Sequence, residues 1–112
     1  MEKTVNILGT EYRIEHLKRY EDSMLNSGEA DGYCDSTSKR IVLRIKDEKD
    51  NSDDYSVYLK KLTRHEIIHA FLFESGLAHS SEWATNEELV DWIAFQAEKI
   101  IKAWQDAGAL KE

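Results

Sequence analysis

The stretch from Asp53 to Ser75 combines the apolar spacing of a long helix with ionisable side chains in its most apolar part. One stripe of this expected helix advances in steps of three and four residues, which places its side chains on one face. Apolar neighbours surround the stripe, so we expect this part of the helix to be buried. Ionisable groups therefore occupy positions where packing favours leucine, and this conflict is typical of functional sites. The stripe contains Tyr58, Leu62, His65, His69 and Leu72.

The ionisable residues of this helix have the spacing of a metal-binding pair. His65 and His69 are four positions apart, about 6 Å along the axis and about 40° around it. Two imidazoles in this relation can bind one zinc ion at about 2.0–2.1 Å. Glu66 lies about 60° further around the helix, beside such an ion, where a general base is needed. By composition, about 0.02 accidental matches to His-Glu-x-x-His are expected in this chain, so the motif is informative.

A second expected helix, from about Asn86 to Asp106, offers the remaining metal donor. A catalytic zinc takes a third protein ligand and keeps one position open. Glu87 and Asp91 are four residues apart at the start of this helix. We expect Glu87 to bind the ion and Asp91 to accept a hydrogen bond from a ligand histidine, which fixes the histidine tautomer. Acidic residues also stabilise a helix N-terminus without any metal, and this alternative stays open for both carboxylates.

The N-terminal part alternates apolar and polar residues as strands do. We predict a hairpin that turns at Gly9-Thr10, with glycine as the first turn residue. Its apolar positions are Val5, Ile7, Tyr12 and Ile14.

The next segment is predicted to contain a short helix and a second hairpin. Residues 17–25 have helical spacing. Residues 35–38 are rich in turn formers and precede an alternating apolar run. We expect Ile41, Leu43 and Ile45 to face the core.

The whole pattern predicts an α+β fold, with a small, mainly antiparallel sheet in the N-terminal half packed against two long helices. Gly76 is expected to end the first helix. Thr85 and Glu88 fit a capping box at the start of the second. The core stripe of the second helix is expected to contain Leu89, Ile93, Ala97, Ile100 and Trp104.

Length and composition limit the classes of protein. A chain of 112 residues predicts a single domain, residues 1–112. The formal net charge of −7 argues against nucleic acid as the main partner. No apolar run reaches the length of a membrane span, and the first residues lack the apolar block of a signal peptide. Cys34 is the single cysteine, which excludes an internal disulfide and suits a reducing compartment. We therefore expect a cytoplasmic protein without a membrane partner.

The motif at residues 65–69, followed by Asn-Glu-x-x-x-Asp at residues 86–91, resembles the gluzincin pattern of thermolysin-like metallopeptidases. It also resembles the minimal metallopeptidase domains of phages and mobile elements, including ImmA/IrrE-like proteins. The close resemblance covers about residues 62–95 and implies a zincin-like fold. One departure is that no downstream His or Tyr can be matched to the transition-state stabiliser of larger gluzincins. By position, the resemblance implies zinc ligands His65, His69 and Glu87, the general base Glu66 and the supporting carboxylate Asp91.

These features predict a zinc-dependent peptidase that acts on a peptide or protein substrate, with Glu66 as general base. An extended substrate is expected to pair with a sheet edge at residues 41–46. Two alternatives stay open: a catalytically silent zinc-binding module with a regulatory or interaction role, and an α+β structural protein without metal. Additional candidates for the site are His79, Tyr33, Tyr55, Tyr58 and Trp83.

Overall fold

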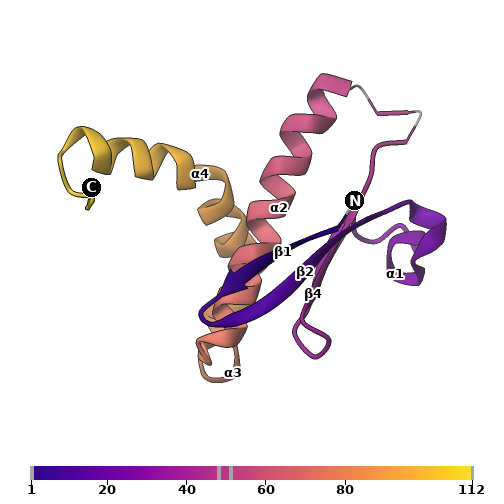
Figure 1. Cartoon of the computed structure of the whole chain (residues 1–112), viewed down its shortest axis with the longest axis horizontal. Coiled ribbons are helices and arrows are strands. Elements are labelled where there is room, and N and C mark those ends of the chain that lie inside the picture. Colours follow the sequence, from indigo (N-terminus) through magenta and orange to yellow (C-terminus); the bar gives the residue numbers. More distant parts are fainter. Residues whose placement is uncertain (1, 48, 51, 112) are drawn as a thin grey trace.

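The structure is a computed structural model that describes residues 2–47, 49–50 and 52–111. Within these residues, four strands of the N-terminal half form one sheet in the order β1-β2-β4-β3, and α2 packs against it (Figure 1). The α+β class predicted from the sequence is confirmed. The strands are β1 (Glu2–Ile7), β2 (Thr10–Leu17), β3 (Gly32–Asp35) and β4 (Arg40–Arg44).

The C-terminal half is helical. Its long helices begin and end within one residue of the predicted positions, and Gly76, with a φ of 86°, follows the end of α2 as expected. In the part of the chain that the structure describes, no helix is both long and apolar enough to cross a bilayer. The helical segments of both halves are, in chain order, η1 (Arg19–Glu21), α1 (Ser23–Asn26), α2 (Ser52–Glu74), α3 (Leu77–Ser80), η2 (Glu82–Thr85) and α4 (Glu87–Asp106).

The sheet is mixed, and its order overturns the expected position of the free edge. β4 pairs in parallel with β2 and antiparallel with β3, so both of its edges are bonded. The prediction that residues 41–46 form a sheet edge is therefore wrong. Ile41, Val42 and Leu43 are fully buried, as in strands that are covered on both faces. The strand with a free edge at this side of the sheet is β3.

The first hairpin has the predicted faces but a different turn. Ile7 pairs with Thr10, so the turn residues are Leu8 and Gly9, one position before the prediction. Both have positive φ, 50° and 92°, as in the type I′ turn that matches strand twist. The Asn6 side chain accepts a hydrogen bond from the Gly9 N–H, which stabilises this turn over the alternative.

The helix predicted at residues 17–25 is wrong as one continuous element. Leu17 ends β2, and the segment then forms the short pieces η1 and α1. Asp22 separates them, because its backbone is extended and its side chain accepts hydrogen bonds from the N–H groups of Met24 and Leu25. An N-cap at this position starts a new helix and interrupts the old one.

The core lies between the sheet and one face of α2 from Leu59 to Ala70. Ile41 and Leu43 belong to it as predicted, whereas Ile45 follows the end of β4 and is only partly buried. Near the end of α2, the Glu74 carboxylate accepts hydrogen bonds from Thr10, Tyr12 and Lys39, which fixes this end of α2 on the sheet. The buried cluster consists of Ile7, Tyr12, Ile14, Ile41, Leu43 and Ala70.

The start of α4 has a different cap from the one predicted. Asn86 is the N-cap, and its side chain accepts a hydrogen bond from the Leu89 N–H at 2.8 Å. The predicted capping box of Thr85 and Glu88 is wrong, because Thr85 belongs to η2 and its hydroxyl donates to the Glu82 carbonyl. The Asn86 cap fixes Glu87 as the first residue of the helix.

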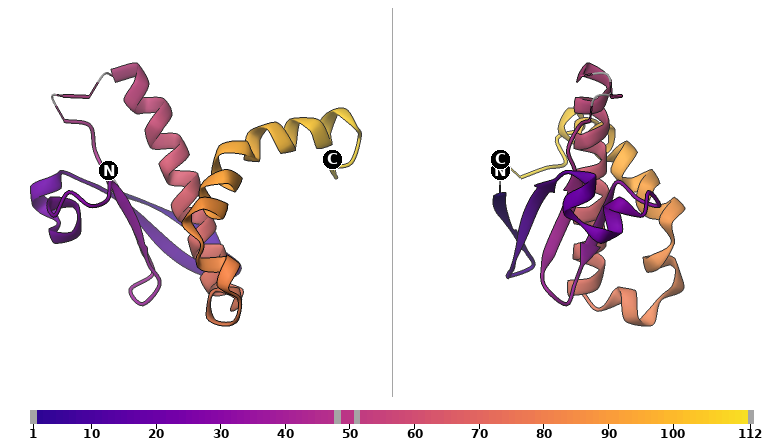
Figure 2. Two further views of the ribbon diagram at one scale, coloured as in Figure 1. Left: turned by 180° about the vertical axis from the view of Figure 1, so that it is seen from behind. Right: turned by 90° about the vertical axis from the view of Figure 1, so that its right-hand side faces the viewer.

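The predicted core stripe of α4 is also wrong. The fully buried residues of α4 are Val90 and Ala94, whereas Trp104 is half exposed. The reason is the path of the helix: α4 starts beside α2 and then extends away from it and from the sheet (Figures 1 and 2). Leu89, Ile93, Ala97 and Ile100 are only partly buried.

Candidate metal centre

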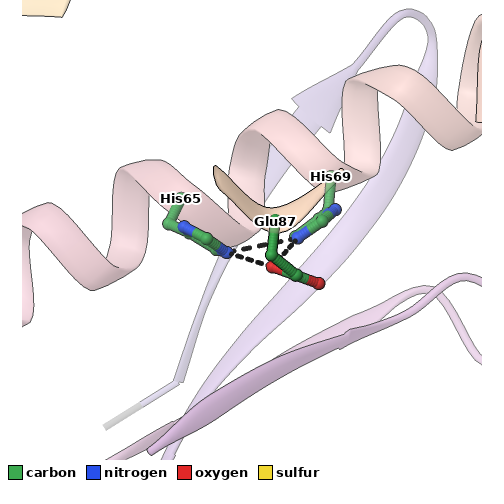
Figure 3. Close-up of side chains that lie close together, drawn as sticks. All are labelled: His65, His69 and Glu87. Carbon is green, nitrogen blue, oxygen red and sulfur yellow. Dashed lines mark hydrogen bonds and ion pairs between the residues drawn. The ribbon is translucent and has the colours of Figure 1, made fainter. Parts of the chain in front are cut away.

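The structure brings the histidines of the motif together on α2. The Nε2 atoms of His65 and His69 lie 3.2 Å apart (Figure 3). Their side chains are 13% and 12% exposed, so both rings are recessed but open to solvent on one side. The one-turn spacing accounts for this convergence, because residues four apart are neighbours on the same helix face.

The chain between the helices returns Glu87 to this point. After Gly76, α3 and η2 reverse the direction of the chain, and α4 begins beside the middle of α2 (Figure 2). The Glu87 Oε1 atom lies 2.9 Å from His65 Nε2 and 3.0 Å from His69 Nε2 (Figure 3). The glutamate side chain is 74% exposed, in contrast to the recessed imidazoles.

The separations between the two Nε2 atoms and Glu87 Oε1 fit a small cation with tetrahedral coordination. A zinc ion with ligands at about 2.0–2.1 Å has ligand atoms about 3.3–3.4 Å apart. The three separations here, 2.9, 3.0 and 3.2 Å, are close to that value and slightly shorter. The ligand atoms therefore require only small shifts, and both the nitrogen–oxygen donor set and its spacing suit zinc.

Asp91 supports this arrangement from the next turn of α4. Its Oδ1 atom lies 3.2 Å from His65 Nδ1 and 3.0 Å from Lys61 Nζ. In the tautomer in which Nδ1 donates to Asp91, the neutral His65 ring directs a lone pair from Nε2 toward Glu87. The pKa of Asp91 is lowered, mainly by the hydrogen bond from Lys61, which keeps the carboxylate an acceptor.

The charge state of Glu87 also favours the binding of a cation at this cluster. Partial burial raises the pKa of this carboxyl, but hydrogen bonds with His69 and His65 outweigh it and lower the pKa overall. An ionised carboxylate has acceptor oxygens and no proton to donate. When a cation replaces the protons of these hydrogen bonds, both imidazoles are neutral and lone pairs of all three groups point at the cation.

Glu66 is a buried carboxyl next to this cluster. It is 5% exposed and borders the same cleft as both histidines. Burial raises its pKa to about 7; the effect of His65 lowers it, and the Glu87 carboxylate raises it further. A carboxyl whose pKa lies near neutrality can both accept and donate a proton, as a general acid–base group must.

A cleft of about 530 Å³ connects these residues to strand β3. Gly32, Tyr33 and Cys34 border the cleft from the sheet side. A Cβ atom at Gly32 would lie 3.1 Å from Leu43 Cδ2 and 3.3 Å from Leu62 Cδ2. The glycine therefore allows β3 to lie close to α2, so that the edge of the sheet lies beside the candidate metal centre.

The tyrosine candidates have their hydroxyls engaged elsewhere. Tyr33 donates to Asp22 at 2.7 Å, Tyr58 donates to Asp31 at 2.6 Å, and Tyr55 donates to a backbone carbonyl of β4. These bonds stabilise the loops around the sheet. They do not place a phenol at the histidine–glutamate cluster.

The other sequence candidates lie at the margin of the site. His79 is exposed on α3, and its ring packs 5.9 Å from Phe73, which borders the cleft. Trp83 is exposed on η2. Burial raises the pKa of the Cys34 thiol to about 12, so this group stays protonated at neutral pH and is a poor metal ligand.

Sequence reasoning missed Lys61 and the position of β3. Lys61 lies four residues before His65, so the same spacing that identified the histidines also places a cation on their stripe. The position of β3 beside α2 depends on strand order, for which the only local signal is the missing side chain at Gly32.

Comparisons with protein-family models, with curated proteins and with solved structures found no match. The interpretation of the site therefore depends on the residues themselves. The arrangement can hold a divalent cation with three protein groups, beside a buried carboxyl and an accessible cleft.

Proposed function

We propose that this chain is a zinc-dependent peptidase. In this proposal His65, His69 and Glu87 hold the ion, and Asp91 orients His65. The observation that carries the proposal is the meeting of two imidazole nitrogens and one carboxylate oxygen within 3.2 Å of one another. Three protein donors with an open side are the arrangement of catalytic zinc sites, whereas structural sites are closed by a fourth protein ligand.

The catalytic step assigned to Glu66 is proton transfer. A bound zinc ion supplies Lewis acidity, which polarises a peptide carbonyl and makes water more acidic. The Glu66 carboxylate takes a proton from the attacking water as the new C–O bond forms. It then delivers this proton to the amine nitrogen as the C–N bond breaks. Its recessed position at the cleft keeps it close to the site.

The proposed substrate is an extended peptide segment. β3 pairs with β4 on one side, and its other edge lies at the cleft. A segment that adds to this edge would satisfy backbone N–H and C=O groups of β3 and lie across the cleft beside Glu66. The main-chain hydrogen bonds would supply affinity that depends little on the substrate side chains.

The direct test combines metal analysis with a peptidase assay. Elemental analysis of the purified protein should give about one zinc per chain, removable by a chelator. Glu66→Gln should retain zinc and lose cleavage of an unstructured protein substrate by at least about 100-fold. Glu88→Gln is the matched control, because it changes an exposed glutamate near the site and should leave both properties unchanged. Wild-type cleavage rates in Glu66→Gln would contradict the role of Glu66.

A catalytically silent zinc-binding module is the second candidate function. The observation that favours it is the engagement of Tyr33 and Tyr58 elsewhere, since these hydroxyls then do not donate to a developing oxyanion. This candidate predicts bound zinc without cleavage of any member of a diverse peptide library. A chain without bound zinc would instead favour the structural protein without metal.

A further inference from the structure

A second cavity lies where the parallel strand pair ends. β2 and β4 run side by side with Leu17 opposite Arg44, so both strands end at the same edge of the sheet. Beyond that edge the chain diverges, to η1 and α1 after β2 and to the loop before α2 after β4 (Figure 1). In open α/β sheets, ligands bind in crevices at the carboxyl ends of parallel strands. The cavity, which we call the β2–β4 pocket, has a volume of about 560 Å³, in the range of small-molecule sites.

The lining of the β2–β4 pocket reverses the charge balance of the chain. In the whole sequence, acidic residues outnumber basic ones by 22 to 15. Among the described residues that line the pocket, four are basic and Asp47 alone is acidic, and its carboxylate lies 3.4 Å from Arg44 Nη1. A concave surface lined by one sign of charge concentrates ligands of the opposite sign, so the pocket favours an anion. The basic residues are Lys18, Arg19, Arg44 and Lys46.

The arginines of the pocket are fixed in place by the protein itself. The Arg44 side chain is 7% exposed, and it donates hydrogen bonds to Asp31 at 3.0 Å and to Asp50 at 2.9 Å. Arg19 donates to the same Asp31 oxygen at 2.8 Å and to the Leu25 carbonyl at 2.6 Å. These carboxylates offset the charge of the arginines, but they hold both guanidinium groups in one geometry. A ligand that contacts this wall therefore costs little side-chain entropy.

The exposed part of the pocket combines an aromatic ring with ammonium groups. Tyr20 is 65% exposed, and Lys18 Nζ lies 5.7 Å from the centre of its ring. Lys46 is exposed after the end of β4 and lines the same pocket. A ring that faces solvent can stack on a flat ligand, whatever the identity of that ligand's ring. Lysine binds phosphate as a compact charge, and a phosphate with nearly two negative charges and three acceptor oxygens can be shared by two lysines.

We propose that the β2–β4 pocket binds a small molecule that combines a phosphate with a flat ring, of the class of nucleoside monophosphates. The ring stacks on Tyr20, and the phosphate is bound by Lys18 and Lys46 beside the wall of fixed guanidinium groups. Inorganic phosphate alone would leave most of the 560 Å³ cavity unfilled. Among the described residues, the pocket shares no lining residue with the cleft at the metal centre, so this inference does not depend on the proposed peptidase function.

Calorimetric titration with AMP, ribose phosphate and adenosine tests the proposal. Wild-type protein should bind AMP at least about 10-fold more tightly than either fragment, because only AMP offers both the phosphate and the ring. The double variant Lys18→Gln with Lys46→Gln should weaken AMP binding by at least about 10-fold. Tyr20→Ser should weaken AMP binding by about 10-fold and leave the binding of ribose phosphate unchanged. Added salt should weaken AMP binding more in the wild type than in the double variant.

Matched controls assign the binding to this pocket. Lys60→Gln with Lys99→Gln makes the same change of charge at exposed lysines outside the pocket, and Trp92→Ser removes an exposed ring on α4. Both controls should bind AMP like the wild type, and all variants should give the same far-UV circular dichroism, which excludes unfolding as the cause. A chelator should leave the affinity for AMP unchanged, which excludes binding of the phosphate to a metal ion at the other site. A wild type that does not bind AMP, or equal weakening by the pocket and control lysine variants, would overturn the proposal.

Discussion

Lys61 on α2 and Asp91 on α4 form an ion pair with 3.0 Å between Nζ and Oδ1. The same Oδ1 atom lies 3.2 Å from Nδ1 of His65. The lysine therefore supports a carboxylate that in turn orients a candidate zinc ligand. Groups in this outer position fix the ring orientation and the basicity of a ligand histidine.

The first prediction concerns this ion pair. Asp91→Asn should weaken zinc binding by about 10- to 100-fold, because a neutral amide is a weaker partner for the imidazole. Lys61→Met should weaken it less, because Lys61 acts only through Asp91. Competition with a chromophoric chelator measures both effects. Lys60→Met, at the exposed neighbouring position, is the control and should bind zinc like the wild type. Equal affinities for zinc in all variants would show that the pair only joins the two helices.

The second prediction concerns metal and stability. A ligand present at about 100 times its Kd stabilises the folded state by about 2.7 kcal/mol. For a domain of this size, zinc should thus raise the Tm by roughly 10 °C, and a chelator should reverse the shift. Glu87→Gln should lose most of the shift, whereas Glu88→Gln, in the same helical turn, should keep it. An identical Tm with zinc and with chelator would support the alternative of a structural protein without metal.

The third prediction concerns the acid stability of the loop before β3. The Asp31 carboxylate accepts hydrogen bonds from Arg19, Arg44 and Tyr58. Burial alone would raise the pKa of Asp31, but the bonds from Arg44, Tyr58 and Arg19 lower it from 3.8 to about 2. The unfolded chain therefore takes up the proton first. The stabilisation, on the order of 2 kcal/mol, is present above the unfolded pKa and is lost as the pH falls toward the folded pKa.

Urea unfolding at a series of pH values measures this effect. Asp31→Asn should be less stable than the wild type at neutral pH, and the difference should shrink as the pH falls from 4 toward 2. Other carboxylates, such as Glu74, will cause some acid destabilisation in both proteins. A difference between the two proteins that stays constant over this range would contradict the assignment to Asp31.

The sequence was sufficient to predict those features that depend only on residues close together in the chain. His65 and His69 meet because residues four apart on a helix are always neighbours. The polar and acidic run at residues 85–88 predicted the start of α4 to within one residue, although the cap is Asn86 and not Thr85, and this placed Glu87 at a helix end. That this end then lies 2.9 Å from His65 depends on the path of α3 and η2, which no periodicity describes.

The sequence was insufficient where the outcome depends on which elements pack together. Ile41 and Leu43 were predicted as core residues, but their pattern cannot tell a central strand from an edge strand, and the edge was misassigned. Similarly, the periodicity of α4 identified an apolar stripe but not the face that α2 covers. That face carries Val90 and Ala94, which are fully buried, and the Ala94 carbonyl accepts a hydrogen bond from Arg64 of α2.

The unequal exposure of the candidate ligands has a consequence for the kinetics of metal exchange. The two imidazoles are recessed on a helix fixed to the sheet, whereas the Glu87 carboxylate faces solvent at the first turn of another helix. A bound ion would therefore be released by stepwise dissociation that starts at Glu87, while both nitrogens still hold it. Its residence time would depend on how often the first turn of α4 frays, and Asn86, which caps that turn, would set the off-rate without touching the ion.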